Sequence, residues 1–288
     1  MAWMDGKSML LHAYKHRYGV GAFSAQNAEM VKGIIEAAEE EQAPVMIQIG
    51  QKAITHLGLE PLKEMVVQYA QGATVPIAIH LDHSRSYTQT MRAIQLGFQS
   101  VMFDGSSRSF EENVRITRLV AEAGHALGIG VEGEIGKIGG VEDDIDVSES
   151  EATITTTEEA LAFSEQTGID YIAVSIGTAH GLYTKEPNLR IARLKEIVAS
   201  IDKPVVLHGG SGVPDAQVKE AIASGVAKIN VDTELRQAVS QAMQARWTKE
   251  PNNLVLADVL QDGIEAMKHV VKHKIRTFGS DRKSSFML

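Results

Sequence analysis

Eight short apolar runs recur along the chain, and each is followed by a longer stretch with amphipathic periodicity. Runs rich in β-branched residues predict strands, and apolar residues spaced three and four apart predict helices. Each pair takes roughly 20–40 residues, which is typical of a βα unit. The predicted strands span 19–25, 44–50, 76–83, 100–106, 130–136, 171–181, 204–212 and 226–233.

Eight βα units in 288 residues favour a closed parallel barrel over an open sheet. The predicted fold class is α/β, a (β/α)₈ TIM barrel, with residues 1–288 forming a single domain. The stretch 258–278 predicts an extra C-terminal helix. An open, doubly wound sheet is the alternative. The polar, acidic segment 136–157 lacks periodicity and is long for a βα connection, so we expect a mobile loop over the active face.

Composition narrows the range of partners. A net charge of −9 argues against nucleic acid or an anionic membrane, since both attract basic surfaces. The absence of cysteine excludes disulfides, thiolate metal sites and cysteine nucleophiles. The beginning of the chain has no apolar segment typical of a signal peptide, and no apolar run reaches membrane-spanning length, so we expect a cytoplasmic protein.

Three histidines lie where a barrel places its active groups, at the carboxyl ends of strands. These are His83, His180 and His208, which belong to the third, sixth and seventh predicted runs. One histidine at a strand end is usually a packed residue, but three at separate strands can hold one ion and leave a fourth position open, as catalytic zinc sites do. The histidines read as ordinary surface or core residues are His12, His16, His56, His125, His269 and His273.

Carboxylates accompany these histidines. Asp82 directly precedes His83 and is the strongest acid/base candidate. Asp104 and Glu132 also lie at strand ends, where each could contact the metal, orient a histidine or cap a helix. The remaining acidic candidates are Glu134 and Glu142.

Glycine-rich and polar turns follow the last two predicted strands. Gly209, Gly210 and Ser211 follow the seventh, and residues 230–233 follow the eighth. Backbone N–H groups exposed at such turns bind phosphate in many barrels. Glycine often serves only the turn, so two such turns at these strands favour a phosphate site more than one alone.

Long motifs in the chain resemble the class II fructose-bisphosphate and tagatose-bisphosphate aldolases, and are most similar to their tagatose-type bacterial branch. The motifs cover 80–83, 100–106, 131–144, 176–183, 207–213 and 228–236, in the family's order and spacing. The resemblance implies zinc ligands at His83, His180 and His208, with Asp82 as the catalytic acid/base. It also implies that Glu142, in the mobile loop, moves a second proton. The segments implied to bind dihydroxyacetone phosphate contain Gly181, Gly209, Gly210, Ser211, Asn230, Val231, Asp232 and Thr233.

The resemblance further implies an activity and its requirements. The expected reaction is reversible cleavage of tagatose- or fructose-1,6-bisphosphate, or a related ketose phosphate, to dihydroxyacetone phosphate and an aldehyde such as glyceraldehyde 3-phosphate. One catalytic Zn²⁺ is expected, with Na⁺ or K⁺ near the phosphate. A homodimer or homotetramer is expected, and some tagatose-type relatives use a separate accessory subunit. A class I mechanism would need a lysine at a strand end, and Lys228 is the only obvious candidate.

Some positions depart from the family pattern. Ser24 replaces a usual Asn, Gly50 a hydroxyl residue and Ser84 a glycine, while Thr184, followed by Lys185, replaces a frequent lysine. We expect these positions near the substrate mouth, where they would change recognition of the aldehyde half. Two other functions stay open: a metal-dependent sugar-phosphate epimerase on the same barrel, and a non-catalytic accessory subunit.

Overall fold

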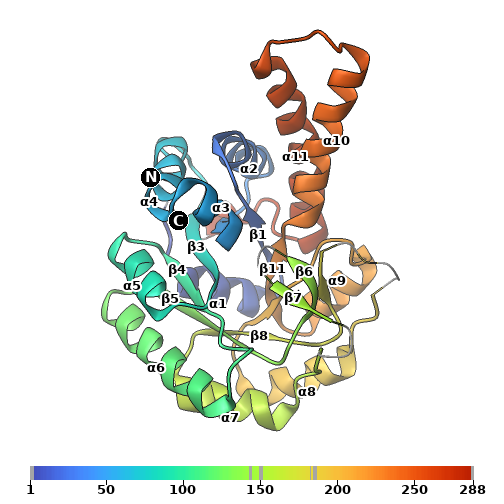
Figure 1. Ribbon diagram of the computed structural model, residues 1–288. Helices are drawn as coiled ribbons and strands as arrows, with labels where there is room; N and C mark the ends of the chain where they lie inside the picture. Colours follow the sequence, from blue (N-terminus) through green and yellow to red (C-terminus); the bar gives the residue numbers. More distant parts are fainter. Residues whose placement is uncertain (1–2, 143–144, 149–151, 182, 184–186, 287–288) are drawn as a thin grey trace.

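Eight parallel strands close into a barrel in the computed structural model, which describes residues 3–142, 145–148, 152–181, 183 and 187–286 (Figure 1). Around the barrel their order is β1-β11-β10-β8-β5-β4-β3-β2. The strands are β1 (Val20–Ser24), β2 (Val45–Ile49), β3 (Ile77–Ser84), β4 (Ser100–Phe103), β5 (Gly130–Ile135), β8 (Tyr171–Val174), β10 (Val205–Leu207) and β11 (Val226–Val231). Each overlaps one predicted run, so the TIM-barrel prediction is confirmed and the open-sheet alternative is wrong.

Helices cover the outside of the barrel, and two of them separate β2 from β3 (Figure 1). The predicted extra C-terminal helix is confirmed as α11. The helices are α1 (Gly6–His16), α2 (Ala28–Glu41), α3 (Gln51–Leu57), α4 (Leu59–Tyr69), α5 (Tyr87–Gln95), α6 (Phe110–Ala126), α7 (Thr157–Thr167), α8 (Ile191–Ile201), α9 (Asp215–Ala223), α10 (Thr233–Lys249) and α11 (Leu256–Phe278), followed by the 3₁₀ turn η1 (Ser284–Phe286).

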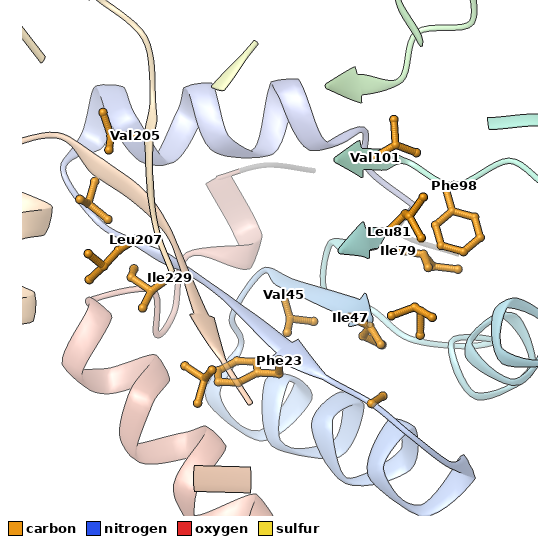
Figure 2. Packing of buried hydrophobic residues seen from close by; sticks show 14 of the residues in the cluster. Phe23, Val45, Ile47, Ile79, Leu81, Phe98, Val101, Val205, Leu207 and Ile229 are labelled. Atoms are coloured by element: carbon orange, nitrogen blue, oxygen red, sulfur yellow. The ribbon is translucent and has the colours of Figure 1, made fainter. Parts of the chain in front are cut away.

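Alternation along the strands divides the apolar core into two clusters. Outward side chains such as Ile47 and Ile79 belong to the large cluster between barrel and helices (Figure 2). Inward side chains such as Met46 and Ala78 pack with Met9 of α1 in a second cluster. Helix α1 therefore closes one end of the barrel, and the carboxyl ends of the strands at the other end are left for the site.

The acidic segment 136–157 contains regular structure, contrary to the prediction of a loop. Strands β6 (Gly139–Glu142) and β7 (Ile145–Val147) form an antiparallel pair, and β9 (Ala179–His180) runs parallel to β6. These strands are two to four residues long, and β6 and β7 contain glycine or acidic residues, which are depleted in strands, so no alternation shows in the sequence. Mobility of this segment stays a prediction.

Formation of β9 also corrects the predicted strand 171–181. The barrel strand β8 ends at Val174, and the chain turns at Gly177, whose φ is +103°. Ala179 and His180 then pair with β6 instead of continuing the barrel. His180 is therefore carried by the small sheet at the mouth.

Helices α10 and α11 form an antiparallel pair that extends well beyond the barrel (Figure 1). Leu235 is the buried residue of α10, and the other residues of this helix are partly or fully exposed. Near the turn between the two helices, Trp247 is 42% exposed and Leu254 is 92% exposed. Among the described residues, no helix is long and apolar enough to cross a membrane.

Candidate active site

The three predicted histidines converge at the mouth of the barrel. The ring centroid of His83 lies 4.6 Å from that of His208 and 5.0 Å from that of His180. One ring nitrogen from each residue lies within 4.8 Å of the others, and all three side chains are buried. Because they come from β3, β9 and the residue after β10, only the folded barrel brings them together.

In two of these histidines, one ring nitrogen bonds a carboxylate and the second ring nitrogen faces the site. Nδ1 of His83 lies 3.2 Å from Oδ2 of Asp104, and Nε2 of His208 lies 2.8 Å from Oε1 of Glu132. The opposite nitrogens, Nε2 of His83 and Nδ1 of His208, are buried without a hydrogen-bond partner among the described residues. This is the arrangement of metal-binding histidines, whose second nitrogen bonds an outer carboxylate. The donor set therefore fits a divalent cation.

The pKa values of His180 and His208 shift in opposite directions. Burial, together with the charge of His83, lowers the pKa of His180 well below its usual value, so its imidazole is neutral, as a metal ligand must be. Burial would also lower the pKa of His208, but the carboxylates of Glu132 and Glu134 raise it to about 9. A bound cation would displace that proton.

Glu134 and Asp104 lie on the Nδ1 side of His83, with carboxylate oxygens 3.8 and 3.2 Å from that nitrogen. With His83 they form a second group of ligand atoms within 4.8 Å of one another. Oε2 of Glu134 lies 3.2 Å from Nδ1 of His208, in a geometry that makes no hydrogen bond. Burial, aided by the charge of Asp104, raises the pKa of Glu134. A cation between Glu134 and Asp104 would relieve the repulsion between their two carboxylates.

Asp82 lies beside the histidines, as predicted. Its Oδ1 accepts a hydrogen bond from Nδ2 of Asn230 at 3.1 Å, and its Oδ2 lies 4.0 Å from Nε2 of His83. Burial would raise the pKa of Asp82, but its interactions with His83, His80 and Lys228 hold that pKa well below the usual value. The group is therefore a carboxylate, the form that accepts a proton.

Beneath the mouth lies a buried network that the sequence did not predict. Nζ of Lys228 lies 2.8 Å from Oε2 of Glu132 and 3.3 Å from Nε2 of His80. Nδ1 of His80 lies 2.6 Å from Oγ of Ser100, which bonds the hydroxyl of Tyr171. Glu132 thus holds His208 with one oxygen and Lys228 with the other. Alternation along the strands would have found these side chains, since 80 and 82, 132 and 134, and 228 and 230 share inward faces.

The two predicted phosphate segments lie against each other. The N–H of Gly210 donates to the carbonyl of Asn230 at 3.0 Å, and the N–H of Asp232 donates to Oγ of Ser211 at 3.3 Å. Thr233 begins α10 directly beyond. The glycine turn and a helix N-terminus therefore meet, an arrangement suited to binding an anion.

Other predicted substrate residues take different positions. Gly209 has a φ of +63°, and a Cβ there would overlap the carbonyl oxygen of Ala179. Tyr183, which the sequence did not single out, accepts from the N–H of Ala179 at 2.8 Å and donates to the carbonyl of Gly209 at 2.9 Å. Gly181 follows β9 directly, at a φ of +86°. The Val231 side chain lies in the apolar core, so only its backbone could contact a ligand.

Positions that depart from the family pattern separate into two groups. Ser24 and Gly50 line a pocket shared with Asp82 and His83, as expected for the mouth. Ser84 is fully buried and hydrogen bonded to side chains of α5, so its placement at the mouth is not supported. Thr184 and Lys185 lie outside the described residues, and Glu142 is described only by its backbone in β6.

Comparison with known proteins identifies the family. The profile of the class II fructose-bisphosphate aldolases matches residues 4–283. The chain belongs to this family. It is therefore an aldolase, an aldehyde-lyase, and the long motifs noted in the sequence are confirmed as family motifs.

Individual proteins named as aldolases resemble it over nearly their whole length. Sulfofructosephosphate aldolase of Alkalicoccus urumqiensis is 59% identical over 284 residues, covering 99% of both chains. Fructose-bisphosphate aldolase of Thermus caldophilus is 41% identical over 300 residues, covering 96% of this chain and 98% of the relative. The crystal structure of the YdjI aldolase from Escherichia coli K12 superposes with a TM-score of 0.86 at 37% identity, covering 98% and 99% of the two chains.

Proposed function

We propose that this class II aldolase is metal-dependent and cleaves a ketose phosphate reversibly to dihydroxyacetone phosphate and an aldehyde. The observation that carries the proposal is the convergence of three buried imidazoles beside the Asp82 carboxylate. His83, His180 and His208 would hold one Zn²⁺, with Asp104 and Glu132 orienting two of them. When bound, the ion would supply Lewis-acid stabilisation of negative charge on the ketone oxygen.

Asp82 has the position and charge to act as the base in cleavage. It would take the proton from the C4 hydroxyl, the C3–C4 bond would break, C4 would become the aldehyde carbon, and the electron pair would stay on C3. In condensation the same carboxyl group would return the proton to the new alkoxide. The amide of Asn230 holds Oδ1 of Asp82 at 3.1 Å, which leaves Oδ2 for this transfer.

Glu142 is proposed to deliver the proton to C3. Strand β6 pairs with β9 through Gly140 and His180, and Glu142 lies two residues further along β6. The phosphate would bind the turn of residues 209–211 and the N-terminus of α10, including residues 230–233. A Na⁺ or K⁺ ion near this turn is part of the same proposal.

Sulfofructose phosphate is the substrate that we propose, because the relative named for it is 59% identical whereas the fructose-bisphosphate aldolase is 41% identical. Ser24 and Gly50, which line the pocket at Asp82, depart from the fructose-bisphosphate pattern and fit a different aldehyde half. A coupled assay of sulfofructose phosphate, fructose 1,6-bisphosphate and tagatose 1,6-bisphosphate, with and without EDTA, tests this. We expect the highest kcat/KM for sulfofructose phosphate; strong preference for fructose 1,6-bisphosphate would contradict it.

The same assay separates the two other functions. An epimerase would produce a second ketose phosphate without releasing a triose phosphate. A non-catalytic accessory subunit would bind without turnover. Asp82 beside His83, with its carboxylate in the pocket, favours the aldolase over both.

We propose further that residues 1–288 form one cytoplasmic domain that assembles as a homodimer or homotetramer through the α10–α11 pair. A groove along α10 is lined by Met243 and Trp247, and Leu254 and Val255 are exposed in the connection between α10 and α11. A second copy of the chain would remove this apolar surface from water. Light scattering should give a multiple of 31.2 kDa, and Trp247→Asp should reduce it. A monomeric wild-type protein would contradict the assembly.

A further inference from the structure

The aspartate and histidine of the site are neighbours in sequence, yet both side chains reach the same mouth. In a regular strand, consecutive side chains point to opposite faces. Here the pairing of β3 with β4 shifts between Leu81 and Ser84, so that Asp82 and His83 together oppose a single residue of β4. This is a β-bulge, which bends a strand and redirects its side chains. His83 has a φ of +46°, which is uncommon for a residue with a side chain.

The backbone of the bulge is held by a side chain. Strand β2 pairs with β3 up to Ile49 and Leu81, and the chain then turns into α3 at Gln51. Because β2 ends there, it offers no further backbone N–H group to the carbonyl of Asp82, the next residue of β3. Nε2 of Gln51 takes that place and donates to the carbonyl oxygen of Asp82 at 2.8 Å.

A chain of hydrogen bonds fixes the orientation of that amide. Nε2 of Gln89 donates to Oε1 of Gln51 at 3.0 Å, Oγ of Ser84 donates to Oε1 of Gln89 at 2.7 Å, and Oγ1 of Thr90 lies 3.1 Å from Oγ of Ser84. A carbonyl can only accept, so Gln51 must present its NH₂ group to Asp82. Its oxygen then faces the NH₂ group of Gln89, whose oxygen needs a donor.

The hydroxyl of Ser84 is that donor. Every bond from Ser84 to the carbonyl of Asp82 runs in one direction, and bonds aligned in this way strengthen one another. Ser84 is fully buried, so its own hydroxyl is out of contact with water. Glycine, the usual family residue at this position, could not supply the bond.

We propose that Ser84 is a positioning residue of the active site: through Gln89 and Gln51 its hydroxyl holds the carbonyl of Asp82, and with it the bulge that places Asp82 and His83. The residue touches neither substrate nor metal. This inference rests on the proposed metal-dependent aldolase function. It also explains why Ser84 does not line the substrate pocket although it follows the Asp-His pair.

The test measures zinc affinity separately from turnover. Wild type and Ser84→Ala are stripped of metal, and the Kd for Zn²⁺ is measured by competition with a chromophoric chelator. We expect the Kd of Ser84→Ala to rise about tenfold and kcat to fall about tenfold, with KM for the ketose phosphate unchanged, which is the usual range for partners that orient ligands. Unchanged zinc affinity in Ser84→Ala would overturn the proposal.

Ser86→Ala is the matched control. Oγ of Ser86 accepts from the N–H of Gln89 at 3.3 Å and caps α5, so its removal loosens the helix without deleting a side-chain donor from the chain. We expect its zinc affinity to match wild type; a loss equal to that of Ser84→Ala would show that helix loosening alone is responsible.

A double-mutant cycle provides the second criterion. Gln51→Met interrupts the chain at its last link, so adding Ser84→Ala should cause no further loss. Additive losses would overturn the proposal. If wild type binds no zinc, the proposed function fails as well; if wild type binds zinc and cleaves substrate while Ser84→Ala behaves identically, only the role of Ser84 is wrong.

Discussion

Lys228 and Glu132 form an ion pair at the centre of the barrel, with 2.8 Å between Nζ and Oε2 and no exposed surface on either side chain. Burial would raise the pKa of Glu132, but Lys228, together with His208 and His80, lowers it to about 2. Glu132 therefore carries a negative charge whose other oxygen holds His208. The lysine that a class I mechanism would have needed instead stabilises a carboxylate beneath the proposed metal ligands.

Replacement of Lys228 by methionine should destabilise the protein strongly. Removing one partner of a buried ion pair costs about 3–5 kcal/mol, because the other charge is left buried without compensation. Urea unfolding of the wild type and Lys228→Met measures the loss. Arg118→Met is the control, since Arg118 and Glu122 form an exposed pair whose loss costs at most about 1 kcal/mol. Equal stability of Lys228→Met and wild type would contradict the account.

Asp82→Asn should stop turnover without emptying the site. Asparagine keeps an oxygen that can accept from Asn230 but cannot take a proton, so kcat should fall about 10²- to 10⁴-fold. Metal content, measured by atomic emission on the same preparation, should stay at one ion per chain. Asp258→Asn, at an exposed position in α11, should leave both values unchanged. Turnover equal to wild type in Asp82→Asn would refute the assigned role.

Gly140→Ala should disturb the mouth of the barrel. Gly140 has a φ of +101°, and a Cβ at this position would overlap the carbonyl oxygen of His180. Strand β6 would have to move away from β9, carrying Glu142 and weakening the support of His180. We expect weaker zinc binding and a lower kcat.

Gly72→Ala separates the backbone cost of replacing a glycine at positive φ from the steric overlap that Gly140→Ala creates with His180. Gly72 has a φ of +88°, and a methyl group added there would meet no heavy atom within 4 Å, so this variant measures the backbone cost alone. Zinc affinity should be unchanged in Gly72→Ala. An equal loss in both variants, or none in Gly140→Ala, would contradict the role of the β6–β9 contact.

The sequence was sufficient to predict the barrel and the convergence of the three histidines at its mouth. Each barrel strand carries a local apolar run, and a parallel barrel places strand ends together, so His83 and His208 could be assigned to one site from their positions alone. Asp82 could be assigned to the same site because it also lies at the end of a predicted strand, directly before His83.

Local sequence patterns could not predict contacts between side chains on strands that are far apart in the chain. Lys228 and Glu132 are 96 residues apart and lie on β11 and β5, which are not neighbours in the barrel, so only closure of the sheet pairs them. His180 lies on a two-residue strand that exists through pairing with β6. The inward turn of His83, directly after the inward Asp82, depends on a bulge, and the outward turn of Ser84 on partners in α5.

Metal content and activity measured on the same preparation decide whether three histidines hold a zinc ion that the reaction needs. X-ray absorption at the zinc edge of the active enzyme should show three imidazole nitrogens at about 2.0 Å, and activity lost in EDTA should return with one equivalent of Zn²⁺. His180→Ala should lose both the third nitrogen and the recovery. Full activity in a preparation shown to be free of metal would contradict the account.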